Sequence, residues 1–215
     1  AYALHDPHRG YYARRISTVG RGGDFTTTAE ISPALSKAIA AWLIKQLRAT
    51  RCRDVIELGP GSGALAVAVK AHLPWIWRMR TRWHLVETSA TLREIQARHP
   101  ALRNARWHDS VESALGACGG AACLYSNEFF DAFPVRLFQR STAGWQEVFV
   151  QIMDGAVKEL LLEEKNLPPS CVWRRDWAAG QRVEVHDSVR QWLAAMAIHW
   201  RRGAMLTIDY GASLE

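Results

Sequence analysis

The chain lacks the marks of several protein classes. No apolar stretch approaches the ~20 residues that a membrane-spanning helix needs, and apolar runs such as residues 38–44 are short and end in charge. Residues 1–10 are polar, which disfavours a secretory signal peptide at this start. Neither an internal repeat nor a low-complexity segment occurs. These absences favour a globular protein without membrane insertion, and we expect it to be cytoplasmic.

Cysteine is scarce and follows no recognisable pattern. The chain has 4 cysteines, no two of them have C-x-x-C spacing, and none lies in a histidine-rich cluster. We therefore expect reduced, mostly buried thiols and no metal site, with zinc or a disulfide as the less favoured alternative. No Ser-His-Asp or Cys-His set indicates covalent catalysis.

The charge is basic but scattered along the chain. The 215 residues carry a formal net charge of +6, and arginine far outnumbers lysine. A basic surface attracts nucleic acid or anionic cofactors. Because these arginines are dispersed and mostly beside tryptophan, we expect a solvated surface rather than nucleic-acid binding. The length suits one domain with an elaboration.

Strands and helices alternate in the first part of the chain. Ser32 before Pro33 predicts a helix start, because serine is a good N-cap and proline suits the first helical turn. We expect strands at 54–58, 83–87, 105–107 and 121–126, and helices at 64–72 and from 88 or 89 to about 99. This alternation predicts βαβ units and a mostly parallel α/β sheet with helices on both faces.

The pattern changes after Pro134. Three strands are expected at 135–139, 145–153 and 156–162, and Asp154-Gly155 is typical of a hairpin turn. A strand at 183–186, a helix to about 201 and a buried strand at 204–208 follow. We divide the chain into an N-terminal lid and helix segment (1–50), a cofactor-binding core (51–134), an antiparallel β insertion (135–165) and a return to the core (166–215).

The central motif is a glycine loop between a strand and a helix, with the sequence Glu57-Leu58-Gly59-Pro60-Gly61-Ser62-Gly63. Glycines allow a tight turn and a close approach of the backbone to a ligand. The spacing also fits a nicotinamide dinucleotide site. However, the Glu57 carboxylate suits the ammonium group of methionine and would repel a pyrophosphate. The loop therefore favours S-adenosylmethionine, with NAD as the alternative and an unliganded turn as a third possibility.

Two further carboxylates follow strands at the same predicted sheet edge. Glu87 ends the second strand, where a carboxylate accepts hydrogen bonds from both hydroxyls of an adenosine ribose. Asp109 follows the third strand, where it would contact adenine or, equally, serve as a helix N-cap.

Two other segments are more specific than the glycine loop. They read Gly23-Asp24-Phe25-Thr26-Thr27-Thr28-Ala29-Glu30-Ile31-Ser32 and Asn127-Glu128-Phe129-Phe130-Asp131-Ala132-Phe133-Pro134. With the glycine loop and residues 206–211, they resemble the MidA-like family of S-adenosylmethionine-dependent methyltransferases, relatives of the mitochondrial complex I assembly arginine methyltransferase. Thr28-Ala29 replaces the family's Ser-Pro, and Phe133 replaces its leucine.

The resemblance implies a Rossmann-like class I methyltransferase fold and a protein arginine substrate. The family continues beyond the fifth strand, so we expect native sequence beyond Glu215, and Ala1 also looks internal. A sheet that stopped at this strand would expose an unpaired edge.

Methyl transfer to an arginine requires carboxylates that orient its guanidinium. Glu128 and Asp131 are the catalytic candidates after the fourth strand, and Asn127 would contact the cofactor or the acceptor nitrogen. Asp131 is alternatively a turn or N-cap residue. Asp24 and Glu30 are second-line substrate contacts.

Two other functions compete with methyl transfer. One is an NAD-dependent oxidoreductase, and the other is a non-catalytic assembly factor that retains the fold. The segment at 127–130 lacks both prolines of the motif that acts on base amino groups, which disfavours a nucleic-acid methyltransferase.

Overall fold

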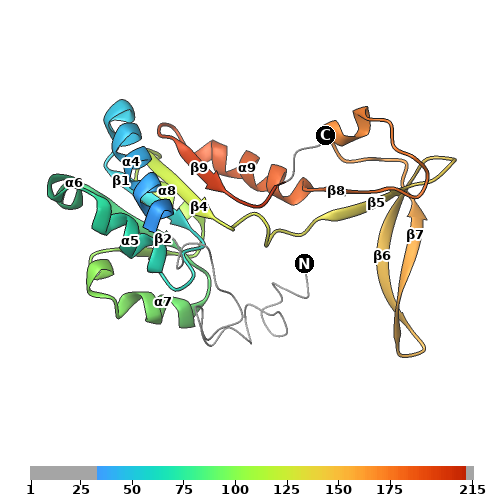
Figure 1. Ribbon diagram of the computed structural model, residues 1–215, viewed down its shortest axis with the longest axis horizontal. Helices are drawn as coiled ribbons and strands as arrows, with labels where there is room; N and C mark the ends of the chain where they lie inside the picture. Colours follow the sequence, from blue (N-terminus) through green and yellow to red (C-terminus); the bar gives the residue numbers. More distant parts are fainter. Residues whose placement is uncertain (1–32, 212–215) are drawn as a thin grey trace. The chain divides into compact units, whose positions relative to one another are not determined.

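The computed structural model describes residues 33–211 of the chain. The described residues form two compact units, one made of residues 33–132 and 195–211 and the other of residues 133–194. Figure 1 shows the elements of each.

The first unit is built on a five-stranded, wholly parallel sheet with the order β3-β2-β1-β4-β9. Its strands are β1 (Asp54–Leu58), β2 (Arg82–Val86), β3 (Arg106–His108), β4 (Ala122–Asn127) and β9 (Met205–Ile208). All five residues of β1 are buried, as expected for a central strand covered on both faces. The predicted α/β fold with a parallel sheet is confirmed.

The helices of this unit are α4 (Pro33–Thr50), α5 (Ala64–His72), α6 (Trp75–Arg80), α7 (Ala90–Ala97) and α8 (Val111–Ala117), with a 3₁₀ turn at Pro100–Leu102. Helix α4 begins at Pro33 as predicted, and the Ser89 side chain caps α7 by accepting from the Leu92 amide.

Helices α6 and α8 were not predicted. Helix α8 supplies the crossover that parallel strands β3 and β4 require. Its seven residues have a weak apolar pattern and include Gly116, so burial of Val111 and Leu115 decides its formation.

Alternate residues of the strands pack on the two faces of the sheet. Val55 and Tyr125 face a core that includes Ile39 and Leu43 of α4, and all four side chains are fully buried. Ile56 lies on the opposite face and is also fully buried, while α8 contacts β2 and β3. Because helices cover both faces, the carboxyl edge of the sheet is where polar side chains are presented.

The second unit is a four-stranded antiparallel sheet with the order β7-β6-β5-β8. Its strands are β5 (Arg136–Arg140), β6 (Trp145–Met153), β7 (Ala156–Glu163) and β8 (Arg182–Val185). Strand β8 pairs with β5, so the antiparallel sheet takes in a strand beyond the expected 135–165 segment. Phe138, Val183 and Val185 form its core, against which Trp145 and Trp173 pack. Several of the tryptophans in the chain therefore pack against this small core.

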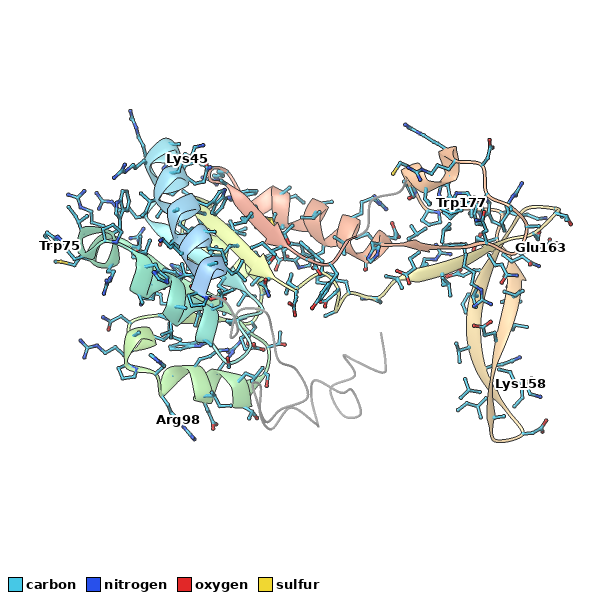
Figure 2. The ribbon with its side chains drawn as sticks, viewed as in Figure 1. Lys45, Trp75, Arg98, Lys158, Glu163 and Trp177 are labelled. Carbon is cyan, nitrogen blue, oxygen red and sulfur yellow. The ribbon has the colours of Figure 1, made fainter. Side chains whose placement is uncertain are left out.

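The β6–β7 hairpin is a two-stranded ribbon beyond Glu147, the last β6 residue that pairs with β5. Lys158 lies on the part of β7 near the turn (Figure 2). Large apolar side chains are exposed along this ribbon, including Val150 at 67% and Ile152 at 77%. A short 3₁₀ helix (Cys171–Arg174) follows the hairpin, and α9 (Asp187–His199) begins in this unit. None of the helices described between residues 33 and 211 has the length and apolar character to span a bilayer.

Candidate functional site

The glycine loop connects β1 to α5, as predicted. Gly61 and Gly63 have φ angles of 55° and 82°, which L residues rarely adopt. Among the residues that the structure describes, no atom lies within 4 Å of a Cβ built on Gly61, so this part of the loop faces space that a ligand can enter. A Cβ on Gly63 would lie 3.1 Å from Gln96 Cγ and from Leu102 Cδ1, so this glycine allows α7 and the 3₁₀ turn to pack closely against the start of α5.

Gly59 packs against the second predicted motif. A Cβ at Gly59 would lie only 2.8 Å from Cδ2 of Phe129. The Phe129 ring therefore lies directly against the backbone of the glycine loop. The loop and Phe129, which are far apart in the sequence, meet at one edge of the sheet.

Glu57 is buried, with 2% of its surface exposed. The Tyr125 hydroxyl donates a 2.8 Å hydrogen bond to its Oε2. Burial raises the pKa of Glu57 to about 8, although the bond from Tyr125 acts in the opposite direction. A cationic partner such as an ammonium group would favour the charged form of this carboxylate.

Glu87 lies directly after β2 and is 8% exposed. Its Oε1 accepts a 2.9 Å hydrogen bond from the Ser89 amide. Burial raises its pKa, whereas the backbone amides of Ser89 and Thr88 lower it. The carboxylate is thus fixed at the end of a parallel strand next to β1, where the predicted ribose contact requires it.

Asp109 follows β3 and accepts a hydrogen bond from Arg93 Nη2. The Arg93 Nε donates a 2.6 Å bond to the Glu87 carbonyl, so this arginine links the ends of β2 and β3. The alternative role of Asp109 as an N-cap was wrong. Ser110 caps α8, because its side chain accepts from the Ser113 amide. The adenine contact stays a prediction.

Asn127 ends β4 and has a buried side-chain nitrogen, Nδ2, without a hydrogen-bond partner in the described part of the chain. A buried donor left unpaired costs about 1–3 kcal/mol. An acceptor on a ligand at this edge would remove that cost. Asn127 is therefore placed where the sequence analysis expected a cofactor or substrate contact.

Glu128 has a φ of 51° and so lies in the left-handed region. This backbone conformation costs a non-glycine residue on the order of 1–3 kcal/mol, and such residues cluster at functional sites. The Glu128 amide donates a 2.8 Å bond to the Ile208 carbonyl of β9, which holds the strained residue in place.

Asp209 supports the turn that carries the catalytic candidates. Its Oδ2 accepts hydrogen bonds from the amides of Phe130 at 2.9 Å and of Asp131 at 3.3 Å. Burial, followed by the charges of Asp209 and Glu128, raises the pKa of Asp131. Three carboxylates therefore lie close together after β4 and β9, and they favour a cation at this edge.

The substrate candidates Asp24 and Glu30 lie outside the described residues.

The described residues include one group of possible metal ligands that the sequence analysis did not predict. Side-chain atoms of Asp54, His84 and Cys118 lie within 4.8 Å of one another.

Hydrogen bonds within the protein already engage the side chains of Asp54 and His84 in this group. Arg82 donates to both Asp54 oxygens, at 2.7 and 2.5 Å, and the His84 Nε2 lies 3.0 Å from Oδ1. Burial, followed by the Asp54 charge, raises the pKa of Cys118 to about 12, so the thiol is protonated at neutral pH.

Tyr125, Arg93 and Gln96 contribute to the site but were not identified from the sequence. Gln96 had a detectable signal, since it follows Leu92 by four residues and so lies on the apolar stripe of α7. The pairing of Tyr125 with Glu57 had none, because 68 residues separate them.

Comparisons with known proteins agree with this geometry. The protein arginine methyltransferase NDUFAF7, mitochondrial, of Danio rerio is 30% identical over 97% of this chain and 56% of its own length. The Homo sapiens protein of the same name is 32% identical over 97% and 54%. The chain thus spans about half the length of the curated relatives it matches.

A crystal structure from Burkholderia thailandensis bound to S-adenosyl-homocysteine has a TM-score of 0.83 and 28% identity, over 98% of this chain and 56% of that one. A native crystal structure from the same organism has a TM-score of 0.75 and 27% identity, over 98% and 55%. Residues 38–215 match the family described as "Putative S-adenosyl-L-methionine-dependent methyltransferase". The chain, with its parallel sheet and glycine loop, therefore belongs to this S-adenosylmethionine-dependent methyltransferase family.

Proposed function

We propose that this protein is an S-adenosylmethionine-dependent methyltransferase that modifies an arginine of a protein substrate. The observation that carries the proposal is the convergence at one sheet edge of the Gly61 backbone, the fixed Glu87 carboxylate and the Asn127 side-chain nitrogen, which has no partner among the described residues. The names of the curated relatives support arginine as the acceptor.

The residues present fit this cofactor. Gly61 lets the backbone approach a ligand, and Glu87 would accept hydrogen bonds from the ribose hydroxyls. Glu57 would attract the methionine ammonium, and the Asn127 amide would donate to a cofactor or acceptor atom. When bound, S-adenosylmethionine supplies an electrophilic methyl group on a sulfonium.

The acidic edge fits a guanidinium acceptor. Glu128 and Asp131 would bind and orient the cationic side chain, because planar guanidinium groups match carboxylates in bidentate geometry. Asp209 holds the turn that carries both residues. Correct orientation of the acceptor towards the methyl group lowers the barrier by removing the entropic cost of alignment.

Calorimetric titration with S-adenosylmethionine, S-adenosylhomocysteine and NAD tests the cofactor. Wild-type protein is expected to bind the two adenosyl ligands at micromolar concentration and not NAD, and Glu87→Ala is expected to lose this binding. Binding of NAD alone would overturn the proposal and favour the oxidoreductase alternative.

Transfer of a radiolabelled methyl group tests the acceptor. The protein is incubated with labelled S-adenosylmethionine and a cell extract, and the proteins are hydrolysed to amino acids. Label is expected in methylarginine, and Glu87→Ala controls for other methyltransferases in the extract. Label in another amino acid would change the acceptor, whereas cofactor binding without transfer would favour the non-catalytic assembly factor.

The compartment stays a prediction. The sequence led us to expect a cytoplasmic protein, whereas the curated relatives are named as mitochondrial. Fractionation of cells that express the full-length native protein would decide between the two.

A further inference from the structure

Gln96 is a fully buried glutamine on α7 that uses both ends of its side-chain amide. Its Nε2 donates a 2.7 Å hydrogen bond to the Gly61 carbonyl in the glycine loop. Its Oε1 accepts a 2.7 Å bond from the Trp107 indole in β3. Burial raises the pKa of Glu87, and the Gln96 side chain is the weakest of the influences that lower it. One side chain thus connects the glycine loop to β3 and influences the carboxylate that follows β2.

These partners belong to three separate segments that meet only in the folded protein. A buried amide is costly unless it is paired, so the partners of Gln96 are held at fixed positions relative to one another. Packing reinforces the hydrogen bonds, because a Cβ on Gly63 would lie 3.1 Å from Gln96 Cγ. Two of these segments, the glycine loop and Glu87, form the proposed cofactor site.

We propose that Gln96 is a positioning residue for cofactor binding, which holds the glycine loop against α7 and β3 in the arrangement that receives S-adenosylmethionine. This inference rests on the proposed function. Gln96 acts through its neighbours, because its own amide is already bonded to protein groups.

The chemistry of the amide explains the choice of residue. Methionine has nearly the same length and volume but neither donates to Gly61 nor accepts from Trp107. Glutamate keeps an acceptor for Trp107, but it would place a second carboxylate beside Glu87. Both substitutions are expected to raise the pKa of Glu87, by loss of a donor in one case and by added repulsion in the other.

The first test measures Glu87 without any added ligand. Carbon NMR follows the titration of its carboxyl group in the wild type, in Gln96→Met and in Gln96→Glu. The pKa of Glu87 is expected to rise in both variants. An unchanged pKa in both would overturn the coupling between Gln96 and Glu87. If the methionine variant does not fold, the glutamate variant carries this test.

The second test is a double-mutant cycle on S-adenosylhomocysteine binding, measured by calorimetry at pH 7. Gln96→Met or, if that variant does not fold, Gln96→Glu is expected to weaken binding about tenfold. The effect is expected to shrink in a Glu87→Gln background, because Gln96 acts partly through that carboxylate. Gln191→Met, a substitution of an exposed glutamine on α9, is the matched control and is expected to leave binding unchanged.

The outcomes separate this inference from the proposed function. Normal ligand binding by the Gln96 variants would overturn the positioning role and leave the proposed function standing. An equal loss in the Glu87→Gln background would show that Gln96 acts through the glycine loop alone, which overturns its coupling to Glu87. If the wild type binds no S-adenosylhomocysteine, the proposed function fails, and the positioning role fails with it.

Discussion

Replacing Glu57 by glutamine is expected to stabilise the protein at neutral pH. The wild-type carboxyl group has a pKa of about 8 in the folded protein, against an ordinary value of 4.5, because it is buried. At a pH between 4.5 and 8, the Glu57 carboxyl group is ionised in the unfolded chain and protonated in the folded protein. The free energy of unfolding therefore falls as pH rises through this window, by about 1.4 kcal/mol per pH unit.

Glutamine removes this dependence because it does not titrate. The variant can still accept the hydrogen bond that Tyr125 donates to Glu57. The free-energy difference between variant and wild type is expected to be small near pH 4.5 and about 3 kcal/mol at pH 7. The difference becomes constant above pH 8, where the Glu57 carboxyl group of the wild type is ionised in both the folded and the unfolded protein.

Urea unfolding at pH 5, 6, 7 and 8 measures this difference. The unfolding midpoint of the variant is expected to exceed that of the wild type by on the order of 1–3 M urea at pH 7. Glu94→Gln, at an exposed position of α7, controls for the loss of one negative charge. A difference that stays constant from pH 5 to 8 would show that Glu57 is ionised in the folded protein and would refute the reasoning. The same variant is expected to bind S-adenosylmethionine more weakly, because the proposed partner of its ammonium is lost.

Three other substitutions test separate parts of the structure. Gly63→Ala is expected to cost about 1–2 kcal/mol of stability in thermal unfolding, because its φ of 82° is left-handed and its Cβ would crowd Gln96; an unchanged melting temperature would contradict this. Asp209→Ala removes the acceptor of the Phe130 and Asp131 amides, so methyl transfer should fall more than cofactor affinity; equal losses would argue against a role confined to this turn. Phe138→Ala is expected to cost about 3–5 kcal/mol in the second unit, because the ring is fully buried there, and to leave S-adenosylhomocysteine binding unchanged; weakened binding would contradict this.

Local sequence features were sufficient to predict the parallel sheet and the glycine loop. The strand at 54–58 is continuously apolar apart from its two acidic residues, and the glycines after it allow the positive φ angles of the loop. The hairpin was predicted at its observed turn because Asp154-Gly155 separates two strongly apolar strands. Each of these features depends on residues close together in the chain.

Other elements were decided by packing between distant segments. The strand at 182–185 has ordinary strand character, but its pairing with β5 depends on the shared core of Phe138 and Val183. Helix α8 is too short to be stable alone and forms because its apolar residues are buried.

In the candidate site, too, some residues could be identified from the sequence, and others only from the folded structure. The sequence identified Glu57 from its place two residues before the first glycine of the loop. It identified Glu87 and Asn127 because each ends or follows a strand that reaches the carboxyl edge of a parallel sheet. The sequence did not reveal the partners that set their properties. Tyr125 and Gln96 reach these residues only after the chain folds, since a hydrogen bond between distant residues depends on side-chain position in three dimensions. Strand order and glycine spacing place the site, and burial and long-range hydrogen bonds set its protonation and rigidity.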